Sequence, residues 1–186
     1  MLLKMHLGRK QMYKYIKRLL DIIISLILII ILSPILLIML IITKIEFSGN
    51  PIYSQYRIGK NEKPFKIYKF KTMDDNTKKT TKVSRVIRTI GLDELLQLFN
   101  VLNGTMSIVG PRPFIVGDCL PSMYNEKRHS VKPGITGLAQ VNGRTTLTHK
   151  EKLKYDDIYV NNVSFIMDLK IVLKTIKYVF KVIIGK

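Results

Sequence analysis

The feature that most constrains this chain is an apolar run near its N-terminus, from Ile22 to Ile42. Of these 21 residues 18 are apolar, and no charged residue lies between Asp21 and Lys44. A run of about 20 apolar residues is long enough to cross a bilayer as one straight helix. The sequence therefore predicts a membrane-associated segment, and the alternatives differ in how that segment enters the bilayer.

Two simple explanations of the run conflict with its flanking residues. A cleaved signal peptide has a shorter apolar region, of about 7–15 residues, followed by small residues at a cleavage site. Here the run is followed by Thr43-Lys44-Ile45-Glu46. A spanning helix keeps its basic flank on the cytoplasmic side. Both flanks of this run are basic, so a single span would carry one of them to the opposite side.

The dipeptide Ser33-Pro34 lies in the middle of the run. Pro34 has no amide hydrogen and its ring clashes with the carbonyl of Ile30, so the helix should kink or break there. Each half then has about 12 residues and spans about 18 Å, less than the roughly 30 Å of hydrocarbon. Ser33 could hydrogen-bond a carbonyl that the break leaves free. We expect residues 1–45 to form a re-entrant helix-break-helix anchor, with an ordinary kinked span as the alternative.

The chain is strongly basic as well as apolar. It has 31 lysines and arginines against 13 acidic residues, a formal charge of +18, and 47% of its residues are hydrophobic. Disordered charged chains are poor in apolar residues, so disorder is excluded for most of the length. The charge predicts an anionic partner: a nucleic acid, a phosphorylated substrate or an anionic membrane. The single cysteine, Cys119, excludes an internal disulfide framework and fits a reducing compartment.

Residues 46–186 have the pattern of a compact, mostly helical α+β domain. Extended segments on both sides of the turn at 59–64 predict a small β-hairpin. Helical spacing predicts helices over 84–90 and 92–102, the second with one apolar face formed by Leu95, Leu98, Phe99 and Leu102.

The C-terminal residues also predict an amphipathic helix. Its apolar face contains Leu169, Val172, Leu173, Ile176, Phe180 and Ile183, and lysines occupy the other face. Such a helix can lie in the plane of the lipid headgroups. The alternative is a helix packed on the domain with its lysines in solvent.

Two adjacent acidic residues, Asp93 and Glu94, occur at the expected start of a helix. Adjacent helical residues diverge by about 100°, so these two would not face each other as a general acid/base pair. The helix dipole favours negative charge at this position. An ionised Asp93 could act as a nucleophile while Glu94 holds a cation such as Mg²⁺, which prefers oxygen ligands shared with phosphates. The alternative is simple complementarity to the dipole.

Arginines accompany this pair in the sequence. Arg88 precedes Asp93 by five residues, Arg112 stands between two prolines, and Arg144 follows a glycine. Arginine forks suit bidentate contacts with phosphate. Lys69 is a further candidate in a basic strand. Taken singly, each arginine could be a surface charge, but an acidic pair with a divalent cation and several arginines suits group transfer at a diphosphate.

Four segments in order resemble the motifs of the bacterial sugar transferase family, the monotopic phosphoglycosyl transferases. Their sequences are YKFKTM at 68–73, GLDELLQLFNV at 91–101, MSIVGPRP at 106–113 and PGITGLAQVNGR at 133–144. The resemblance extends from about Lys14 to Lys181, which is almost the whole chain.

The resemblance implies transfer of a sugar 1-phosphate from a nucleotide sugar, usually a UDP-sugar, to polyprenyl (undecaprenyl) phosphate. Asp93 would attack the β-phosphorus, release UMP and carry the phosphosugar covalently, and Asp93 and Glu94 would bind Mg²⁺. The residues implied to bind phosphates are Arg88, Arg112 and Arg144, and further substrate contacts would come from Lys69, Gln140, Asn142 and Asp156. The break at Ser33-Pro34 would match the family's re-entrant helix, with the catalytic domain on the cytoplasmic face of the bacterial inner membrane.

The sequence departs from the family pattern in several places. Leu96 stands where the family usually has proline, Thr105 where aspartate is common, Ile58 in place of a proline and Leu138 in place of a tryptophan. The segment 117–128 is shorter than in relatives. These departures bear on loop geometry and on the choice of sugar, and they leave the acidic pair and the three arginines in place.

Two other classes of function compete with that of an enzyme. A membrane-tethered nucleic-acid-binding protein would suit the charge, but the sequence has no recognition helix, zinc finger or aromatic RNA motif, so we expect no nucleic-acid partner. A non-catalytic membrane scaffold would keep the fold without the chemistry. We expect anionic membrane lipids as partners of this chain. An exposed membrane anchor could also pair into a homodimer.

Overall fold

The computed structural model describes residues 2–47, 49–75, 77–117, 126–143 and 146–184. It confirms a mostly helical chain with a long apolar N-terminal helix and little sheet. The elements in chain order are α1 (Leu2–Glu46), β1 (Ile52–Ile58), η1 (Lys60–Glu62), β2 (Pro64–Phe70), α2 (Lys82–Ile90), η2 (Leu92–Glu94), α3 (Gln97–Leu102), β3 (Ser107–Val109), η4 (Glu126–Ser130), β4 (Gly134–Thr136), α4 (Leu138–Val141), α5 (His149–Asn161) and α6 (Phe165–Ile184).

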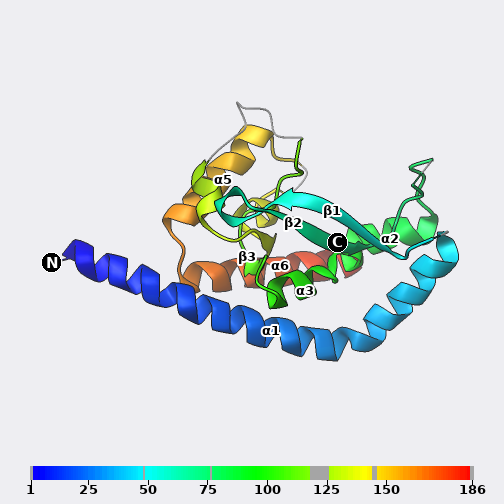
Figure 1. Cartoon of the computed structure of the whole chain (residues 1–186), viewed down its shortest axis with the longest axis horizontal. Helices are drawn as coiled ribbons and strands as arrows, with labels where there is room; N and C mark the ends of the chain where they lie inside the picture. Colours follow the sequence, from blue (N-terminus) through cyan, green and yellow to red (C-terminus); the bar gives the residue numbers. More distant parts are fainter. Residues whose placement is uncertain (1, 48, 76, 118–125, 144–145, 185–186) are drawn as a thin grey trace.

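Helix α1 runs along one side of all the other elements and bends toward its C-terminal end (Figure 1). Pro34 lies inside this helix, which continues through it without a break. The Ser33 hydroxyl donates a hydrogen bond of 2.8 Å to the carbonyl of Ile30. That carbonyl is the one for which Pro34 has no amide hydrogen. The predicted interruption is therefore a bend in one continuous helix, because a side-chain hydroxyl replaces the missing backbone donor.

The polarity of α1 is reversed relative to a helix on a water-soluble protein. Its polar residues Asp21, Ser25 and Thr43 are buried, with exposed fractions of 4%, 0% and 0%. Exposed apolar side chains cover the opposite side, among them Ile23, Leu26, Ile30, Ile31, Leu37 and Ile41. The segment Met12–Glu46 is long and apolar enough to cross a membrane. Within its most apolar stretch of 18 residues, 11% is buried by the rest of the chain. Exposed apolar surface of this extent is compatible with membrane association.

Side chains from the first half of α1 attach the helix to the domain. The Asp21 carboxylate accepts hydrogen bonds from the hydroxyl of Ser107 (3.0 Å) and the amide of Ile108 (2.9 Å). Arg18 donates to the carbonyls of Val101 (2.6 Å) and Leu102 (2.9 Å), at the end of α3. Helix ends leave carbonyls without intrahelical donors, and Arg18 supplies a donor to Leu102, whereas the carbonyl of Val101 also accepts from the amide of Gly104 (3.0 Å).

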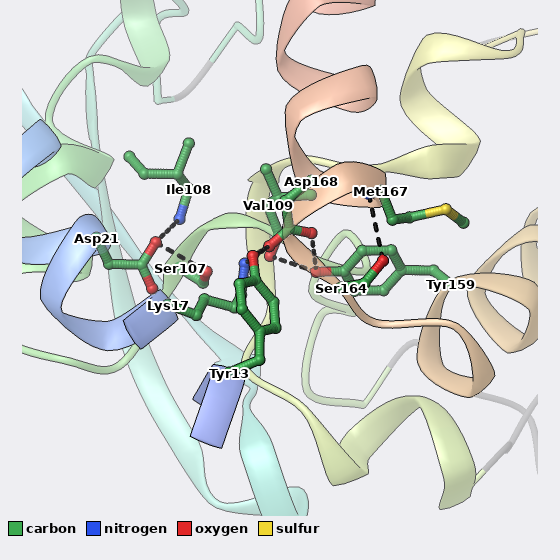
Figure 2. Close-up of polar contacts among 10 residues, drawn as sticks. All are labelled: Tyr13, Lys17, Asp21, Ser107, Ile108, Val109, Tyr159, Ser164, Met167 and Asp168. Carbon is green, nitrogen blue, oxygen red and sulfur yellow. Dashed lines mark hydrogen bonds and ion pairs between the residues drawn. The ribbon is translucent and has the colours of Figure 1, made fainter. Parts of the chain in front are cut away.

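A second attachment centres on Asp168 of α6 (Figure 2). Its carboxylate accepts from Lys17 Nζ (2.5 Å) and the hydroxyl of Tyr13 (2.7 Å), both on α1. The hydroxyl of Tyr159, on α5, lies 2.8 Å from the same carboxylate and 3.1 Å from the carbonyl of Val109. One buried carboxylate thus links α1, α5, α6 and β3.

The hairpin predicted around the turn at 59–64 is confirmed. Strands β1 and β2 pair in antiparallel register from Ile52 opposite Phe70 to Ile58 opposite Pro64. Phe70 then packs with Met39 of α1, Ile87 of α2 and Leu96 in one buried cluster. The hairpin, α1 and α2 therefore share a core. A separate parallel pair, β3 with β4, lies nearer α5 and α6.

The helix predicted over 92–102 divides into η2 and α3. Leu95 and Leu96 keep helical backbone angles, but the amides of Leu95, Leu98 and Phe99 bond carbonyls three residues earlier. A 3-10 turn advances the chain by 120° per residue instead of 100° and so rotates the residues that follow. As a result Leu96, Leu98 and Val101 are buried, whereas Phe99 is 42% exposed. The prediction of a shared apolar face that includes Phe99 is wrong for this reason.

Helix α6 combines both alternatives considered for the C-terminus. Ile171 is buried against Val109 and Tyr159, and Val172 packs on the same cluster. The rest of the predicted apolar face is 44–60% exposed, namely Leu169, Leu173, Ile176, Phe180 and Ile183. The helix therefore packs on the domain along one line and presents apolar side chains along another.

Candidate active site

The acidic pair lies on the single turn η2, between α2 and α3. Helix α2 ends at Gly91, whose φ of 86° and ψ of 16° place it in the left-handed region that glycine adopts without strain. The chain reverses there and enters η2 immediately. Asp93 is buried, with 8% of its surface exposed. The pair therefore follows a helix end and a glycine turn, instead of opening a regular helix as predicted.

Two cations hold Glu94. Lys69 Nζ, from β2, lies 2.6 Å from Glu94 Oε1, and Arg112 Nη2 lies 2.9 Å from the same oxygen. Burial by itself would raise the pKa of Glu94, but Arg112 and Lys69 outweigh it and lower the pKa to about 2. Glu94 is therefore ionised at neutral pH. Among the described residues, Glu94 Oε2 accepts no hydrogen bond.

Asp93 has the opposite electrostatic environment. Burial, and then the charge of Glu94, raise the pKa of Asp93 above its usual 3.8, while Lys69 and Arg88 oppose this change. Neighbouring carboxylates whose environments move their pKa values apart commonly divide chemical roles between them. Here one carboxylate is fixed in ion pairs, and the other carries a destabilised negative charge.

Asp93 opens onto a cationic cavity of about 300 Å³. Its basic residues outnumber its acidic ones: Arg57, Lys69, Lys71, Lys78 and Arg88 line it with Asp74, Asp75 and Asp93, and Lys71 Nζ lies 2.6 Å from Asp75 Oδ2. Clustered cations in a concave site attract phosphorylated ligands. Because Arg88 and Lys69 come from different elements, the tertiary structure brings these two predicted residues together beside Asp93.

Glu94 lies on the wall of a second cavity, of about 270 Å³, which is mostly apolar. Leu28 and Leu32 of α1 form part of this wall, and residues of α6 from Val172 to Val179 form another. Arg112 and Gln140 line the cavity beside Glu94. Both amide atoms of Gln140, Oε1 and Nε2, are buried without a hydrogen-bond partner among the described residues. Buried polar groups are normally paired, so this amide is available to a ligand.

The remaining predicted residues lie elsewhere. Asn142 donates to the carbonyl of Leu138 (2.8 Å) and accepts from Lys174 (3.2 Å), so it ends α4 and lines neither cavity. Asp156 is buried on α5 and also lines neither cavity. Arg144 lies outside the described residues.

Arg128, which the sequence did not suggest, connects Asp156 to the site. It is buried, and its Nη2 lies 2.8 Å from Asp156 Oδ2 and 2.7 Å from the backbone carbonyl of Arg112. Its guanidinium carbon lies 3.4 Å from the ring centroid of Phe114. Asp156 thus supports Arg112 through Arg128. No local pattern marks Arg128 among the many basic residues of this chain.

Asn100 is a second residue that sequence reasoning missed. Its side chain accepts from the amide of Tyr68 (3.1 Å) and donates to the carbonyl of Lys66 (2.7 Å), while fully buried. These bonds fix β2 against α3 and so position Lys69 beside Glu94. A polar residue between Phe99 and Val101 was the available signal, since a buried amide needs such partners.

The two carboxylates fit one mode of metal binding only. In the described part of the chain, no group of three or more His, Cys, Asp or Glu side chains converges on one point. Mg²⁺ is commonly held by one or two carboxylates, waters and substrate phosphates, without an all-protein cage. Asp93 and Glu94 are carboxylates of the kind such a site uses, and they line different cavities.

Comparison with known proteins points to the same family as the four sequence motifs. The family model for bacterial sugar transferases matches residues 12–182. EpsL of Bacillus subtilis (strain 168), described as an uncharacterized sugar transferase, is 41% identical over 177 residues, which cover 88% of this chain and 87% of EpsL. The UDP-glucose:undecaprenyl-phosphate glucose-1-phosphate transferase of Klebsiella pneumoniae is 43% identical over 197 residues, covering 91% of this chain and 40% of its own length.

A third relative differs in the sugar that its name gives. The UDP-N-acetylgalactosamine-undecaprenyl-phosphate N-acetylgalactosaminephosphotransferase of Aeromonas hydrophila is 37% identical over 184 residues, covering 89% of this chain and 44% of its own length. The chain thus spans most of EpsL and less than half of the Klebsiella and Aeromonas relatives.

Proposed function

Because the chain belongs to the bacterial sugar transferase family, we propose that it transfers a sugar 1-phosphate from a UDP-sugar to undecaprenyl phosphate. The observation that carries this proposal is the position of the acidic pair between two unlike cavities. Asp93 lines the cationic one and Glu94 the apolar one. A water-soluble diphosphate suits the first cavity, and a phosphorylated lipid suits the second.

In the first half-reaction the diphosphate of the UDP-sugar lies in the cationic cavity, with Arg88 and Lys69 near its oxygens. A carboxylate oxygen of Asp93 forms a bond to the β-phosphorus, and the bond from that phosphorus to the oxygen bridging to UMP breaks. UMP leaves with the bridging oxygen and its electron pair. The carboxylate of Asp93 is suited to this attack because burial destabilises its charge.

In the second half-reaction a phosphate oxygen of undecaprenyl phosphate attacks the same phosphorus, and the carboxylate of Asp93 leaves. The first isoprene units would lie in the apolar cavity between α1 and α6, with the lipid phosphate beside Arg112. The free amide of Gln140 is available to a phosphate or sugar oxygen there. Asp93 and Glu94 Oε2 would hold Mg²⁺, which supplies neutralisation of diphosphate charge when bound.

A substrate screen tests this function. Purified full-length protein is incubated with undecaprenyl phosphate, MgCl₂ and a panel of UDP-sugars, and UMP release and labelled lipid product are measured. We expect one or a few UDP-sugars to give both UMP and a lipid-linked sugar diphosphate. UMP release without lipid product, or neither with the whole panel, would contradict the proposal.

The environment of Asp93 predicts a pH dependence. Its pKa is raised, so the rate of adduct formation should fall on acidification before an ordinary aspartate would protonate. Arg88 is one of two cations that lower this pKa, and therefore Arg88→Gln should move the acidic limb of the pH–rate profile to higher pH. The shift is measured as the rate of adduct formation in a single turnover, from about pH 4 to pH 8.

Arg85→Gln is the matched control for this shift. It removes the same charge from an exposed position on the same helix, and Arg85 does not line the cavity. An identical acidic limb in the Arg88 variant and the wild type would show that Arg88 does not act on Asp93.

We also propose that α1 enters and leaves the membrane on the cytoplasmic face. The proline inside the bent helix, the exposed apolar side chains and the basic residues at both ends support this arrangement. In intact bacterial cells, single cysteines at Lys14 and Lys79, placed in a Cys119→Ser background, should both resist an impermeant maleimide and react only after permeabilisation. Labelling of position 14 in intact cells would indicate a spanning helix.

A further inference from the structure

A third cavity, of about 410 Å³, lies apart from the candidate active site and shares no lining residue with the other two. Five basic side chains line it: Lys14, Lys17 and Arg18 of α1, Lys60 of η1, and Lys132 before β4. Figure 2 shows four of its lining residues, Lys17, Asp21, Ser107 and Tyr159. Segments far apart in the sequence thus bring positive charge to one place.

The charges in this cavity are incompletely neutralised. Lys17 pairs with Asp168, and Arg18 donates to two backbone carbonyls, which carry no net charge. Among the described residues, Lys14, Lys60 and Lys132 have no carboxylate within ion-pair distance. Asp21, the acidic residue in the wall, already accepts hydrogen bonds from Ser107 and Ile108.

The basic groups are also close enough to repel one another. Arg18 Nη2 and Lys132 Nζ lie 3.2 Å and 3.4 Å from the point that a Cβ on Gly104 would occupy. Burial, and then the charge of Arg18, lower the pKa of Lys132. Burial, and then Lys14, lower the pKa of Lys60. An anion in the cavity would relieve this repulsion.

We propose that this cavity binds the phosphate of an anionic phospholipid headgroup. The basic residues of α1 stand directly before the apolar run, beside the exposed side chains of Tyr15, Ile16 and Leu19. Apolar residues, including Val131, Val160 and Val163, complete the walls. A phosphate ion would use the cations alone, whereas a lipid would also use this apolar surface. Basic clusters beside a membrane segment attract anionic lipids in this way.

Native mass spectrometry of the detergent-solubilised full chain tests the site. The wild type should retain phosphatidylglycerol in preference to phosphatidylcholine. The double variant Lys60→Gln/Lys132→Gln should lose roughly tenfold in phosphatidylglycerol affinity, since each lysine near bound anionic lipid contributes a several-fold factor. Lys150→Gln/Lys154→Gln removes the same charge from exposed positions on α5 and should bind as the wild type does.

Two further measurements keep the result interpretable. Lys60→Arg/Lys132→Arg should restore binding, which separates loss of charge from loss of folding. Inorganic phosphate at equimolar concentration should leave the bound lipid in place. Unchanged lipid preference in the double glutamine variant would overturn the proposal, and so would displacement by inorganic phosphate, which would make this a site for a soluble anion.

Discussion

Asp93→Asn is expected to reduce sugar-phosphate transfer at least about a thousandfold, because it removes the nucleophile of the proposed covalent mechanism. Both UMP release in a single turnover and the labelled protein adduct should disappear, since both would depend on the proposed bond from Asp93 to phosphorus. Asp157→Asn makes the same change on α5, outside both cavities, and should leave the rate within about twofold. A labelled adduct that persists in Asp93→Asn would identify another nucleophile.

The same substitution should preserve or increase stability. The folded state raises the pKa of Asp93 above its unfolded value, so folding favours the protonated form and the ionised form weakens the fold near neutral pH. A neutral asparagine removes that cost. We therefore expect an unchanged or higher melting temperature together with loss of activity, a combination typical of a residue kept for function.

Glu94→Gln should show the opposite change in stability. The folded state lowers the pKa of Glu94 from 4.5 to about 2. Its ionised form therefore stabilises the fold above about pH 4.5, and this contribution is lost as the pH falls toward 2. At neutral pH the variant should lose on the order of 2 kcal/mol, because Lys69 and Arg112 keep an amide acceptor but lose the charge. Melting temperatures of both variants at pH 7 compare the two carboxylates directly.

Asp168→Ala is expected to destabilise the protein by about 3–5 kcal/mol, the usual cost of removing one partner from a buried ion pair. Lys17, Tyr13 and Tyr159 would all lose their shared acceptor. Asp168→Asn keeps a neutral acceptor of the same shape and should cost less. Lys170→Ala, an exposed position on the same helix, is the control and should change stability by less than about 0.5 kcal/mol.

A functional effect should accompany this loss. Asp168 holds the first half of α1 against the domain, and Leu28 and Leu32 of the same helix line the apolar cavity. We therefore expect the KM for undecaprenyl phosphate to rise in Asp168→Asn while the KM for the UDP-sugar changes little. Chemical unfolding in detergent and steady-state kinetics measure the two effects. Equal changes in both KM values would show that α1 does not shape the proposed lipid-binding side of the site.

The local features of this chain were predictable because their causes are local. Pro34 lacks a backbone donor wherever it stands, so the bend in α1 and the role of Ser33 followed from two adjacent residues. The hairpin followed from extended segments on both sides of one turn, and the acidic pair stood out in a chain with few acidic residues. Phe99 was misplaced because its exposure depends on the hydrogen bonding of the preceding turn.

The residues that line each cavity come from distant parts of the chain. Lys69 and Arg112 meet on one oxygen of Glu94 from positions far before and after it in the chain. Gln140, from the later helix α4, lines the apolar cavity beside Glu94. Asn142 ends α4 close to Gln140, and Asp156 supports Arg112 through Arg128. Neither residue lines either of the two cavities. Spacing along a chain does not report such distances, since they result from how helices and strands pack.

The sequence by itself determined the long apolar helix, the proline within it, the family and the acidic pair on which the proposed chemistry rests. Each of these depends on backbone chemistry or on residues close together in the chain. Only the tertiary structure decided that Asp93 and Glu94 line different cavities, that one carboxylate is held in ion pairs while the other is destabilised, and that five basic residues converge beside the start of the apolar run. Burial and Coulomb interactions depend on distance in space, and packing alone sets that distance.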